Sequence, residues 1–357
     1  MNTETGIDLG GQIQQQVREA IRAHKKLCIV GGDSKSFYGR EPEGEPIHVS
    51  GHCGIVRYTP TELVLTARAG TTLHEIEQLL GEQNQLLPFE PPYFKSSATL
   101  GGTIATGLAG PARPYRGSVR DFILGSKCLT GHGEILKFGG EVMKNVAGFD
   151  ASRLMAGALG TLGILLEVTV KVLPRPKRRL TLVWECKPGE ALARMNQWSG
   201  RPLPISASVY DDGRLYLRLS GTEAGVDDAH GRLGGEICQD DDRFWQDIRE
   251  HQHTFFLHEG PLWRISVPAA TPPMNVNGQW LFEWGGAQRW LNTDMPADDI
   301  RKLVTAAGGH ATLFRGGDRK GNVFQSLPAS LYVLHKNLKA AFDPRGIMNP
   351  GRLYLGL

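Results

Sequence analysis

Hydrophobic and polar residues follow two different periods along this chain, and together they predict a mixture of helices and strands. In residues 12–24 the apolar side chains of Ile13, Val17 and Ile21 recur at every fourth position, which is the spacing of an amphipathic helix. The apolar run 27–30 then predicts a short buried strand. The same reasoning predicts further strands at 47–49, 54–58 and 63–67 and a helix at 72–80.

The middle of the chain predicts a hairpin followed by a long strand. The hairpin covers residues 122–138, with a turn around two glycines at 131 and 133. Three further glycines, Gly157, Gly160 and Gly163, precede a strongly β-forming run at 164–173. A Rossmann fingerprint needs a helix after its glycines, so the predicted strand excludes a Rossmann fold here.

A basic, proline-rich segment at 174–179 marks the clearest domain boundary. The pattern beyond it is β-α-β-β and then partly repeats, which predicts an antiparallel sheet with helices on one face. Strands or hairpins are predicted at 180–185, 205–219, 262–267, 280–291 and 310–314, and helices at 190–198, 226–233, 241–251 and 298–307.

The last 30 residues change character. Residues 330–342 predict a helix with Leu331, Leu334 and Leu338 on one face. Turn-forming residues follow at 343–351. A disordered tail would hardly need the apolar Ile347 and Met348 among them, so we expect this tail to pack back onto the first domain.

Composition narrows the classes of function. The chain has 357 residues, 40% of them apolar and 22% charged, and a formal charge of +3, which is too small to indicate nucleic-acid binding. Its five cysteines lie too far apart to hold an iron-sulfur cluster or a typical zinc site. We expect a cytoplasmic protein, because the first residues lack a secretory pattern and no apolar run approaches the roughly 18 residues of a membrane span.

The densest chemical signal is residues 97–121, which contain five glycines and no acidic residue before Asp121. Glycine lets a backbone approach a ligand closely, and exposed amides can bind phosphate oxygens. The loop Gly31–Ser36, which follows the first predicted strand, is a second candidate for a pyrophosphate. It matches neither the Walker spacing nor a G-x-G-x-x-G motif, so either stretch alone is also compatible with ordinary surface turns.

In combination, however, four segments resemble the FAD-binding domain shared by vanillyl-alcohol-oxidase-type and p-cresol-methylhydroxylase-type flavoproteins. They are Gly31–Ser36, Leu100–Asp121, Gly160–Ile164 and the closing Asp343-Pro-x-Gly-Ile-x-Asn-Pro-Gly. Longer phrases resemble the E subunits of bacterial glycolate oxidases over nearly the full length. These phrases are Val30–Phe37, Gly107–Pro114, Phe138–Gly148 and Ala307–Ala311.

The resemblance implies an α+β architecture in three parts. These are a two-subdomain FAD-binding domain of this type at 1–175, a reduced α+β cap domain with an antiparallel sheet at 176–325, and a C-terminal segment at 326–357. The glycine loops would bracket the FAD pyrophosphate, Gly160–Ile164 would lie near the adenosine, and Asn349 would lie near the isoalloxazine. The implied contacts are Gly31, Gly32, Asp33, Ser34, Lys35, Ser36, Pro91, Thr99, Leu100, Gly101, Gly102, Thr106, Gly110, Arg116, Gly117, Asp121, Gly160, Thr161, Gly163, Ile164 and Asn349.

Several departures from the family pattern are informative. The phosphate loop has neither the His that tethers FAD in some relatives nor a Cys, which implies non-covalent FAD. Related 2-hydroxy-acid dehydrogenases have a larger cap with two metal-binding histidines. Here only His310 lies in a comparable place, which implies no metal site.

His310 is a candidate catalytic base or a polar strand residue, and Arg264 is a candidate for bidentate binding of a carboxylate. Lys144 and Asn145 are weaker candidates for flavin or substrate contact, and Arg113 and Arg120 for phosphate or partner contact.

Two functions follow as hypotheses. In the first, the chain oxidises glycolate or a similar 2-hydroxy acid to the 2-oxo acid. In the second, it is an electron-transfer or assembly subunit beside a D-like FAD subunit, that is, one that resembles the D subunit of glycolate oxidases. A stand-alone alcohol or sugar oxidase is a third alternative. An F-like iron-sulfur subunit, one that resembles the F subunit of glycolate oxidases, would carry electrons toward quinone. The chain would reach the inner membrane only through its partners.

The cap contains four closely spaced tryptophans, which are either a docking surface or part of the core. They are Trp245, Trp280, Trp284 and Trp290.

Overall fold

The computed structural model describes residues 5–140 and 151–357, and these residues fall into two compact units. Unit 1 contains residues up to 108, residues 118–174 and residues 319–357. Unit 2 contains residues 109–117 and 175–318. The predicted boundaries near 175 and 325 lie close to these divisions. Residues 109–117 belong to unit 2, whereas the prediction placed them in the FAD-binding domain. This segment interrupts the glycine-rich stretch at 97–121.

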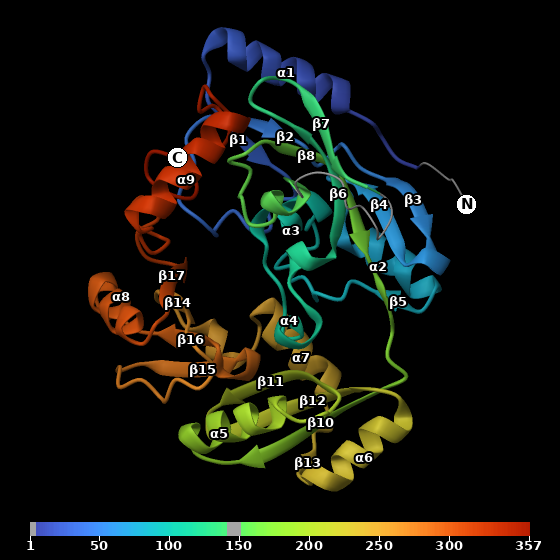
Figure 1. The fold of residues 1–357 in the computed structure, drawn as a ribbon, viewed down its shortest axis with the longest axis vertical. Helices are drawn as coiled ribbons and strands as arrows, with labels where there is room; N and C mark the ends of the chain where they lie inside the picture. Colours follow the sequence, from blue (N-terminus) through green and yellow to red (C-terminus); the bar gives the residue numbers. More distant parts are fainter. Residues whose placement is uncertain (1–4, 141–150) are drawn as a thin grey trace. The chain divides into compact units, whose positions relative to one another are not determined.

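Unit 1 contains a five-stranded antiparallel sheet in the order β3-β4-β8-β6-β7 (Figure 1). Its strands are β3 (Ile55–Thr59), β4 (Val64–Arg68), β8 (Ile164–Lys171), β6 (Ile123–Leu129) and β7 (Ile135–Gly139). A separate parallel pair joins β1 (Leu27–Val30) to β2 (Glu45–His48), and a short ladder joins β5 (Gln85–Leu86) to β9 (Leu173–Pro174). The glycines before β8 lead into a strand, as the sequence predicts.

Helix α1 (Gly10–Ala23) closes one part of the unit 1 core. Its buried side chains Ile13 and Val17 are 2% and 0% exposed, and they pack with Leu27 of β1, Leu166 of β8 and Met348 near the C-terminus. Full burial of each such side chain stabilises the fold by about 1.5–3 kcal/mol. The chain's two ends therefore share one core. The remaining helices of unit 1 are α2 (Leu73–Glu82), α3 (Leu100–Thr106) and α9 (Ala329–Phe342), with short 3-10 turns at Pro60–Glu62, Val119–Phe122 and Ala151–Met155.

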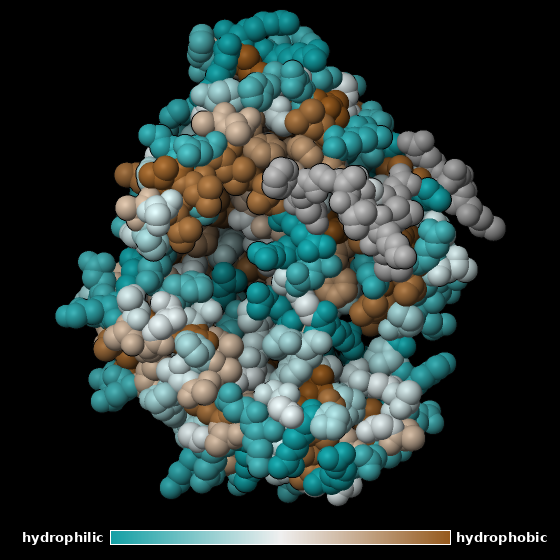
Figure 2. Space-filling view, in the orientation of Figure 1, coloured by the Kyte–Doolittle hydropathy of each residue, from teal (hydrophilic) through white to brown (hydrophobic). Residues whose placement is uncertain are grey.

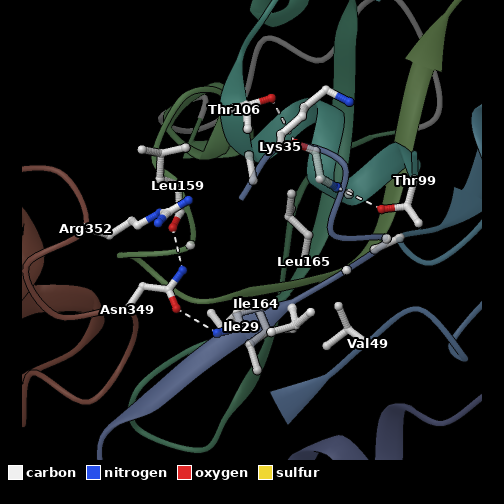
Figure 3. A pocket seen from close by; sticks show the side chains of 18 of the residues that line it. Ile29, Lys35, Val49, Thr99, Thr106, Leu159, Ile164, Leu165, Asn349 and Arg352 are labelled. Carbon is white, nitrogen blue, oxygen red and sulfur yellow. Dashed lines mark hydrogen bonds between the residues drawn. The ribbon is translucent and has the colours of Figure 1, made fainter. Parts of the chain in front are cut away.

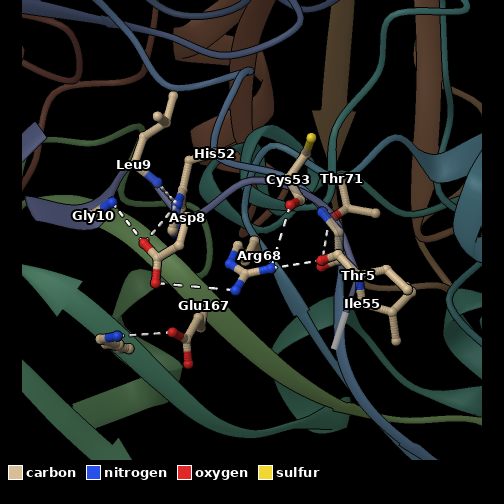
Figure 4. A network of polar contacts seen from close by, with 12 residues as sticks. Thr5, Asp8, Leu9, Gly10, His52, Cys53, Ile55, Arg68, Thr71 and Glu167 are labelled. Atoms are coloured by element: carbon tan, nitrogen blue, oxygen red, sulfur yellow. Dashed lines mark hydrogen bonds and ion pairs between the residues drawn. The ribbon is translucent and has the colours of Figure 1, made fainter. Parts of the chain in front are cut away.

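A buried polar network fixes the segment before α1 to the sheet (Figure 4). His52 is fully buried, and its Nδ1 accepts a hydrogen bond from the Leu9 amide at 3.0 Å. Arg68 donates to the Thr5 carbonyl at 2.7 Å, and its guanidinium lies 4.0 Å from the Asp8 carboxylate. Burial lowers the pKa of His52, although Asp8 opposes that shift. The His52 ring is therefore neutral near pH 7 and carries its proton on Nε2.

The C-terminal helix α9 has an unexpected orientation. Lys339 is 8% exposed, and its Nζ lies 2.7 Å from Asp343 Oδ2 and donates to the carbonyls of Thr161 and Met348. Burial lowers the pKa of Lys339, and the Asp343 carboxylate counteracts this. Leu331 and Leu334, which the sequence places on one apolar face, are instead 45% and 61% exposed. The buried ion pair therefore decides which side of the helix faces unit 1.

Unit 2 is built on an eight-stranded antiparallel sheet in the order β13-β10-β12-β11-β15-β16-β14-β17 (Figure 1). The sheet is larger than the small one that the sequence predicts, because the two β-α-β-β halves join edge to edge through β11 and β15. Its strands are β10 (Arg178–Glu185), β11 (Ile205–Asp211), β12 (Arg214–Gly221), β13 (Glu236–Ile237), β14 (Leu262–Ser266), β15 (Gln279–Glu283), β16 (Gln288–Asn292) and β17 (His310–Arg315).

The two faces of this sheet differ in character. Three helices, α5 (Pro188–Ser199), α6 (Glu223–Leu233) and α8 (Ala297–Ala306), bury apolar side chains against one face. On the other face, Trp245 of α7 (Asp241–Glu250) donates to Thr181 Oγ1 at 2.8 Å. The Arg218 guanidinium lies over the ring of Trp245. That second face also carries buried polar side chains, so it is not a simple hydrophobic layer. Three further short elements of unit 2 are α4 (Arg113–Arg116) and the 3-10 turns at Thr254–Leu257 and Trp284–Gly286.

Candidate functional site

The main pocket of unit 1 is lined by four segments that lie far apart in the sequence (Figure 3). They are β1 with the loop after it, α3 with Thr99 before it, residues 155–165 at the start of β8, and the closing turn after α9, and the single residues Pro42, Val49 and Ala69 complete the lining. One end is apolar and is formed by Ile29, Val49, Ile164 and Leu165.

All six residues of the loop Gly31–Ser36 line the pocket. The loop passes so close to residue 97 that a Cβ on Gly32 would lie 1.5 Å from the Ser97 carbonyl oxygen. Lys35 is 6% exposed, and its Nζ donates to the Tyr93 carbonyl at 3.4 Å. The loop is thus held by backbone contacts, and its position depends on the missing side chain at Gly32.

Helix α3 contributes Thr99, Gly101, Gly102 and Thr106 to the pocket. Its first amides are already used: Gly101 donates to the Ala69 carbonyl at 2.8 Å, and Gly102 donates to Thr99 Oγ1 at 3.2 Å. The expectation that these glycines supply phosphate-binding amides therefore needs revision. A Cβ on Gly31 or Gly102 would meet only the Thr99 hydroxyl within 4 Å. These two glycines leave open a cradle that side chains would fill, which fits a bulky phosphate group.

Asn349 joins three parts of the pocket wall (Figure 3). Its Oδ1 accepts from the Ile29 amide at 2.7 Å, and its Nδ2 donates to the Leu159 carbonyl at 2.6 Å. The backbone amide of Asn349 donates to the Leu27 carbonyl at 3.0 Å. The same wall includes Gly160, Gly163 and Ile164. Asn349 therefore positions both β1 and the turn before β8.

Arg352 and Cys28 are among the pocket residues that the sequence did not identify. The Arg352 guanidinium donates to the carbonyls of Tyr38 at 2.6 Å, Ser36 at 2.8 Å and Arg40 at 2.6 Å. Burial lowers the pKa of Arg352, and it raises the pKa of the Cys28 thiol. Arg352 is thus a half-buried cation on the wall of the candidate phosphate site. The sequence feature that could have indicated Arg352 is its position directly after the closing Asn-Pro-Gly turn.

Four predicted contacts in unit 1 lie outside the pocket lining. Leu100 is fully buried in the core, and Pro91 is buried in its connector. Thr161 is 3% exposed, and its hydroxyl donates to the Ala158 carbonyl. The Asp121 carboxylate accepts from the Ser118 amide and hydroxyl, and these hydrogen bonds lower the pKa of Asp121. Each has a local structural role.

Three further predicted contacts, Gly110, Arg116 and Gly117, belong to unit 2 and do not line the pocket. Gly110 accepts from Trp284 Nε1 at 3.2 Å, and Arg116 donates to Ser220 Oγ at 3.1 Å. The Arg113 guanidinium also lies over the Trp284 ring. The glycine-rich stretch is therefore divided, with its first half in the pocket and its second half fixed to the sheet of unit 2. Lys144 and Asn145 lie outside the described residues.

The structure brings the two catalytic candidates together on the second face of the unit 2 sheet. Arg264 of β14 pairs with Thr312 of β17, and His310 of β17 pairs with Ser266 of β14. Paired residues share a face, so all four side chains lie on the same side. Partial desolvation and the Arg264 charge lower the pKa of His310. An imidazole that is neutral near pH 7 thus lies beside a cation, an arrangement that suits binding and deprotonation of a hydroxy acid.

The neighbouring strands extend this polar face. Glu283 is 4% exposed and accepts from Trp290 Nε1 at 2.6 Å and from Gln288 Nε2 at 2.9 Å. Gln288 pairs with Ser266, which connects Glu283 to the Arg264 and His310 group. Trp245 and Trp290 are 4% and 3% exposed, so these tryptophans serve core packing. We call Arg264, Ser266, Gln288, His310 and Thr312 the polar face of unit 2.

The described residues contain neither a cluster of metal ligands nor a membrane-spanning helix. Within residues 5–140 and 151–357 no group of three His, Cys, Asp or Glu side chains could hold a metal ion. None of the helices that the structure describes is long and apolar enough to cross a membrane.

Comparison with protein families matches residues 11–139 to the FAD binding domain family. FAD is therefore the cofactor. The matched range includes the loop Gly31–Ser36 and helix α3. The cradle at Gly31 and Gly102 and the cations Lys35 and Arg352 fit a pyrophosphate, and the apolar end fits a flat ring.

Comparison with individual proteins extends the likeness to the whole chain. The chain is 48% identical to glycolate oxidase subunit GlcE of Escherichia coli strain K12, over 98% of this chain and 99% of that protein. It is 32% identical to glycolate oxidase subunit GlcD of Bacillus subtilis strain 168, over 36% of this chain and 27% of that protein. The crystal structure of p-cresol methylhydroxylase with substrate bound covers 97% of this chain and 87% of its own, with a TM-score of 0.71 at 16% identity. The predicted α+β fold class is confirmed.

Proposed function

Since the chain belongs to the family of glycolate oxidase E subunits, we propose that it is the FAD-binding subunit of a complex that oxidises glycolate or a similar 2-hydroxy acid to the 2-oxo acid. The observation that carries the proposal is the 48% identity to GlcE, which extends over both units. A D-like FAD subunit and an F-like iron-sulfur subunit would complete the complex. The iron-sulfur partner would pass electrons to quinone and provide any contact with the membrane.

In this proposal the pocket of unit 1 holds FAD without a covalent bond. The loop Gly31–Ser36 and the glycines of α3 accommodate the pyrophosphate, and Arg352 and Lys35 offset its charge. Asn349 fixes the walls on either side. Bound FAD supplies the hydride acceptor for oxidation of the C–H bond. The protein itself supplies binding, orientation and charge.

The polar face of unit 2 would bind the hydroxy acid. The Arg264 guanidinium has the planar fork that a carboxylate accepts in bidentate fashion. His310 is neutral near pH 7 because its pKa is lowered, so a ring nitrogen can take the proton of the substrate hydroxyl. Ser266 and Thr312, paired with these two residues, would orient the substrate hydroxyl.

One observation favours a second candidate function, in which the chain is an electron-transfer or assembly subunit and a D-like partner carries out the oxidation. The likeness to GlcD covers only 36% of this chain. Most of the chain therefore has no counterpart in that comparison. In this alternative, the polar face would be a structural feature of the sheet.

Anaerobic mixing of the purified chain with glycolate distinguishes the two candidates. The flavin absorption near roughly 450 nm is followed, because reduction bleaches it. Bleaching by glycolate alone assigns the active site to this chain. A yellow protein that bleaches only after the partner subunits are added assigns it the supporting role. A protein that neither contains nor takes up FAD contradicts both.

A further inference from the structure

The exposed apolar surface of unit 1 is concentrated at its C-terminal end. Among the described residues ten large apolar side chains are exposed, and four of them lie within residues 331–355. These are Leu331, Val333, Leu334 and Leu355, which are 45%, 55%, 61% and 70% exposed. In Figure 2 hydrophobic residues gather over the position of α9. We call these four side chains the α9 face.

The α9 face is held in place by specific contacts. The buried Lys339, with its Asp343 partner, points into unit 1 and prevents the helix from turning its leucines inward. The hydroxyl of Tyr332 donates to the Leu355 carbonyl at 3.3 Å, which holds the C-terminal turn against the helix. Rotating α9 to bury Leu334 would expose the ion pair and break the hydrogen bonds of Lys339. The exposed leucines are therefore a fixed property of the fold.

The charge of this face indicates what covers it. Residues 329–342 contain no acidic residue, and Lys336 is an exposed cation beside Val333 and Asn337. A partner surface that combines apolar side chains with carboxylates would match both features. A membrane surface fits less well, because a helix that lies on a membrane has a polar face rich in lysine and arginine exposed to water. Here α9 has two lysines and no arginine, and one of the two, Lys339, is buried in unit 1, so the helix has no such basic face.

We propose that the α9 face is the docking surface for another subunit of the oxidase complex, whose own surface there is apolar and edged by carboxylates. This inference rests on the proposed function, because it requires a complex to join. Contiguous exposed apolar patches on a folded unit are typical of protein interaction sites. Of the four tryptophans that the sequence offered as a docking surface or as core packing, Trp245 and Trp290 are buried, and Trp280 and Trp284 are half-buried.

Titration of the purified full-length chain with the purified partner subunits tests the proposal. The unmodified chain is compared with Leu331→Asp/Leu334→Asp and with Leu303→Asp, a matched control. Leu303 is a 42% exposed leucine on α8 of unit 2. We expect the double variant to weaken binding by at least roughly 30-fold, as the loss of an interface hot spot would. The control should change it less than about twofold. Lys336→Glu should weaken binding about threefold and reduce its salt dependence.

Folding of the variants is checked by FAD content and thermal unfolding, which the exposed positions should leave unchanged. Binding by the double variant that equals that of the unmodified chain overturns the docking surface and leaves the proposed function intact. No binding by the unmodified chain contradicts the proposed complex and the docking surface together. Two further results would also overturn the proposal: self-association of the unmodified chain that the double variant abolishes, and binding of the unmodified chain alone to anionic phospholipid vesicles.

Discussion

The pocket of unit 1 and the polar face of unit 2 are built in opposite ways. The pocket is made largely of backbone: glycines at 31, 32, 101 and 102 give it shape, and carbonyls hold the side chains that line it. The polar face is made of side chains, such as Arg264 and His310, that adjacent strands place beside one another. The first arrangement depends on the path of the chain, and the second depends on strand register.

This difference explains how each region can change. A backbone pocket loses its ligand when a small atom is added, because a Cβ either collides with neighbouring backbone, as at Gly32, or fills space meant for the ligand, as at Gly31 and Gly102. A side-chain surface tolerates substitutions without loss of fold, and its chemistry can change one residue at a time. We therefore expect FAD binding to be sensitive to glycine substitutions in unit 1, and substrate chemistry to be sensitive to charge in unit 2.

The largest effect should come from the ion pair that closes unit 1 behind the pocket. Lys339→Met leaves the fully buried Asp343 carboxylate without its cation, which should reduce the free energy of unfolding by about 3–5 kcal/mol. Chemical denaturation measures this change. Lys336→Met on the exposed side of the same helix is the control and should change it by less than about 0.5 kcal/mol. Equal effects of the two substitutions would contradict the buried role of Lys339.

The next effect tests the backbone pocket itself. Gly32→Ala places a Cβ against the Ser97 carbonyl and forces the loop to move, at a cost of about 1–3 kcal/mol. We expect the purified variant to retain less than a tenth of the flavin bound by the unmodified chain, measured from its absorption spectrum. Gly189→Ala is the matched control, because no atom lies within 4 Å of its Cβ position. A Gly32→Ala variant with full flavin content would show that the loop does not shape the site.

Substitutions on the polar face of unit 2 should separate chemistry from cofactor binding. Arg264→Gln or His310→Gln should leave FAD content unchanged. Loss of a hydrogen bond to a charged group would lower the rate of flavin reduction by glycolate by about 10–100-fold. Stopped-flow absorption of the assembled complex measures that rate. Arg214→Gln, at a 59% exposed side chain, is the control. Unchanged reduction by both polar-face variants would favour the supporting-subunit alternative.

The smallest effect concerns acid stability. His52 accepts the Leu9 amide only when its Nδ1 is unprotonated, and burial lowers its pKa below 6.5 in the folded chain. As the pH falls, the unfolded chain takes up the proton first, so this contribution to stability is full above about pH 6.5 and is lost below it. His52→Gln should flatten the decline in the free energy of unfolding between about pH 7 and 5 by about 1 kcal/mol, the value of one hydrogen bond. His74→Gln, at an exposed position, should leave that decline unchanged.

Local patterns in the sequence predicted much of the fold and part of the site. The amphipathic spacing of α1, the strand after Gly163 and the repeated strands of unit 2 all appear in the structure. The loop Gly31–Ser36, helix α3 and Asn349 line one pocket, although Asn349 is far from the other two in the sequence. These features were predictable because each motif carries its own backbone conformation.

The remaining features depend on contacts that no local pattern contains. Arg352 acquires its place from three carbonyls at positions 36, 38 and 40. Gly110 and Arg116 lie outside the pocket because they form hydrogen bonds with Trp284 and Ser220 of unit 2. The leucine spacing of α9 predicted that its leucines share one face but not which side of the helix is buried, and the buried pair of Lys339 and Asp343 determines that side. The only sequence signal was the separation of four residues between these two charges.

Titration of the FAD-free chain with FAD, followed by quenching of flavin fluorescence, tests most directly whether cofactor binding and substrate chemistry reside in separate units. We predict that Arg264→Gln binds FAD within about twofold of the unmodified chain, while Gly32→Ala binds it at least about tenfold more weakly, in line with the cost of overpacking. The opposite result, with Gly32→Ala unchanged and Arg264→Gln unable to bind FAD, would contradict the assignment of the cofactor to the pocket of unit 1.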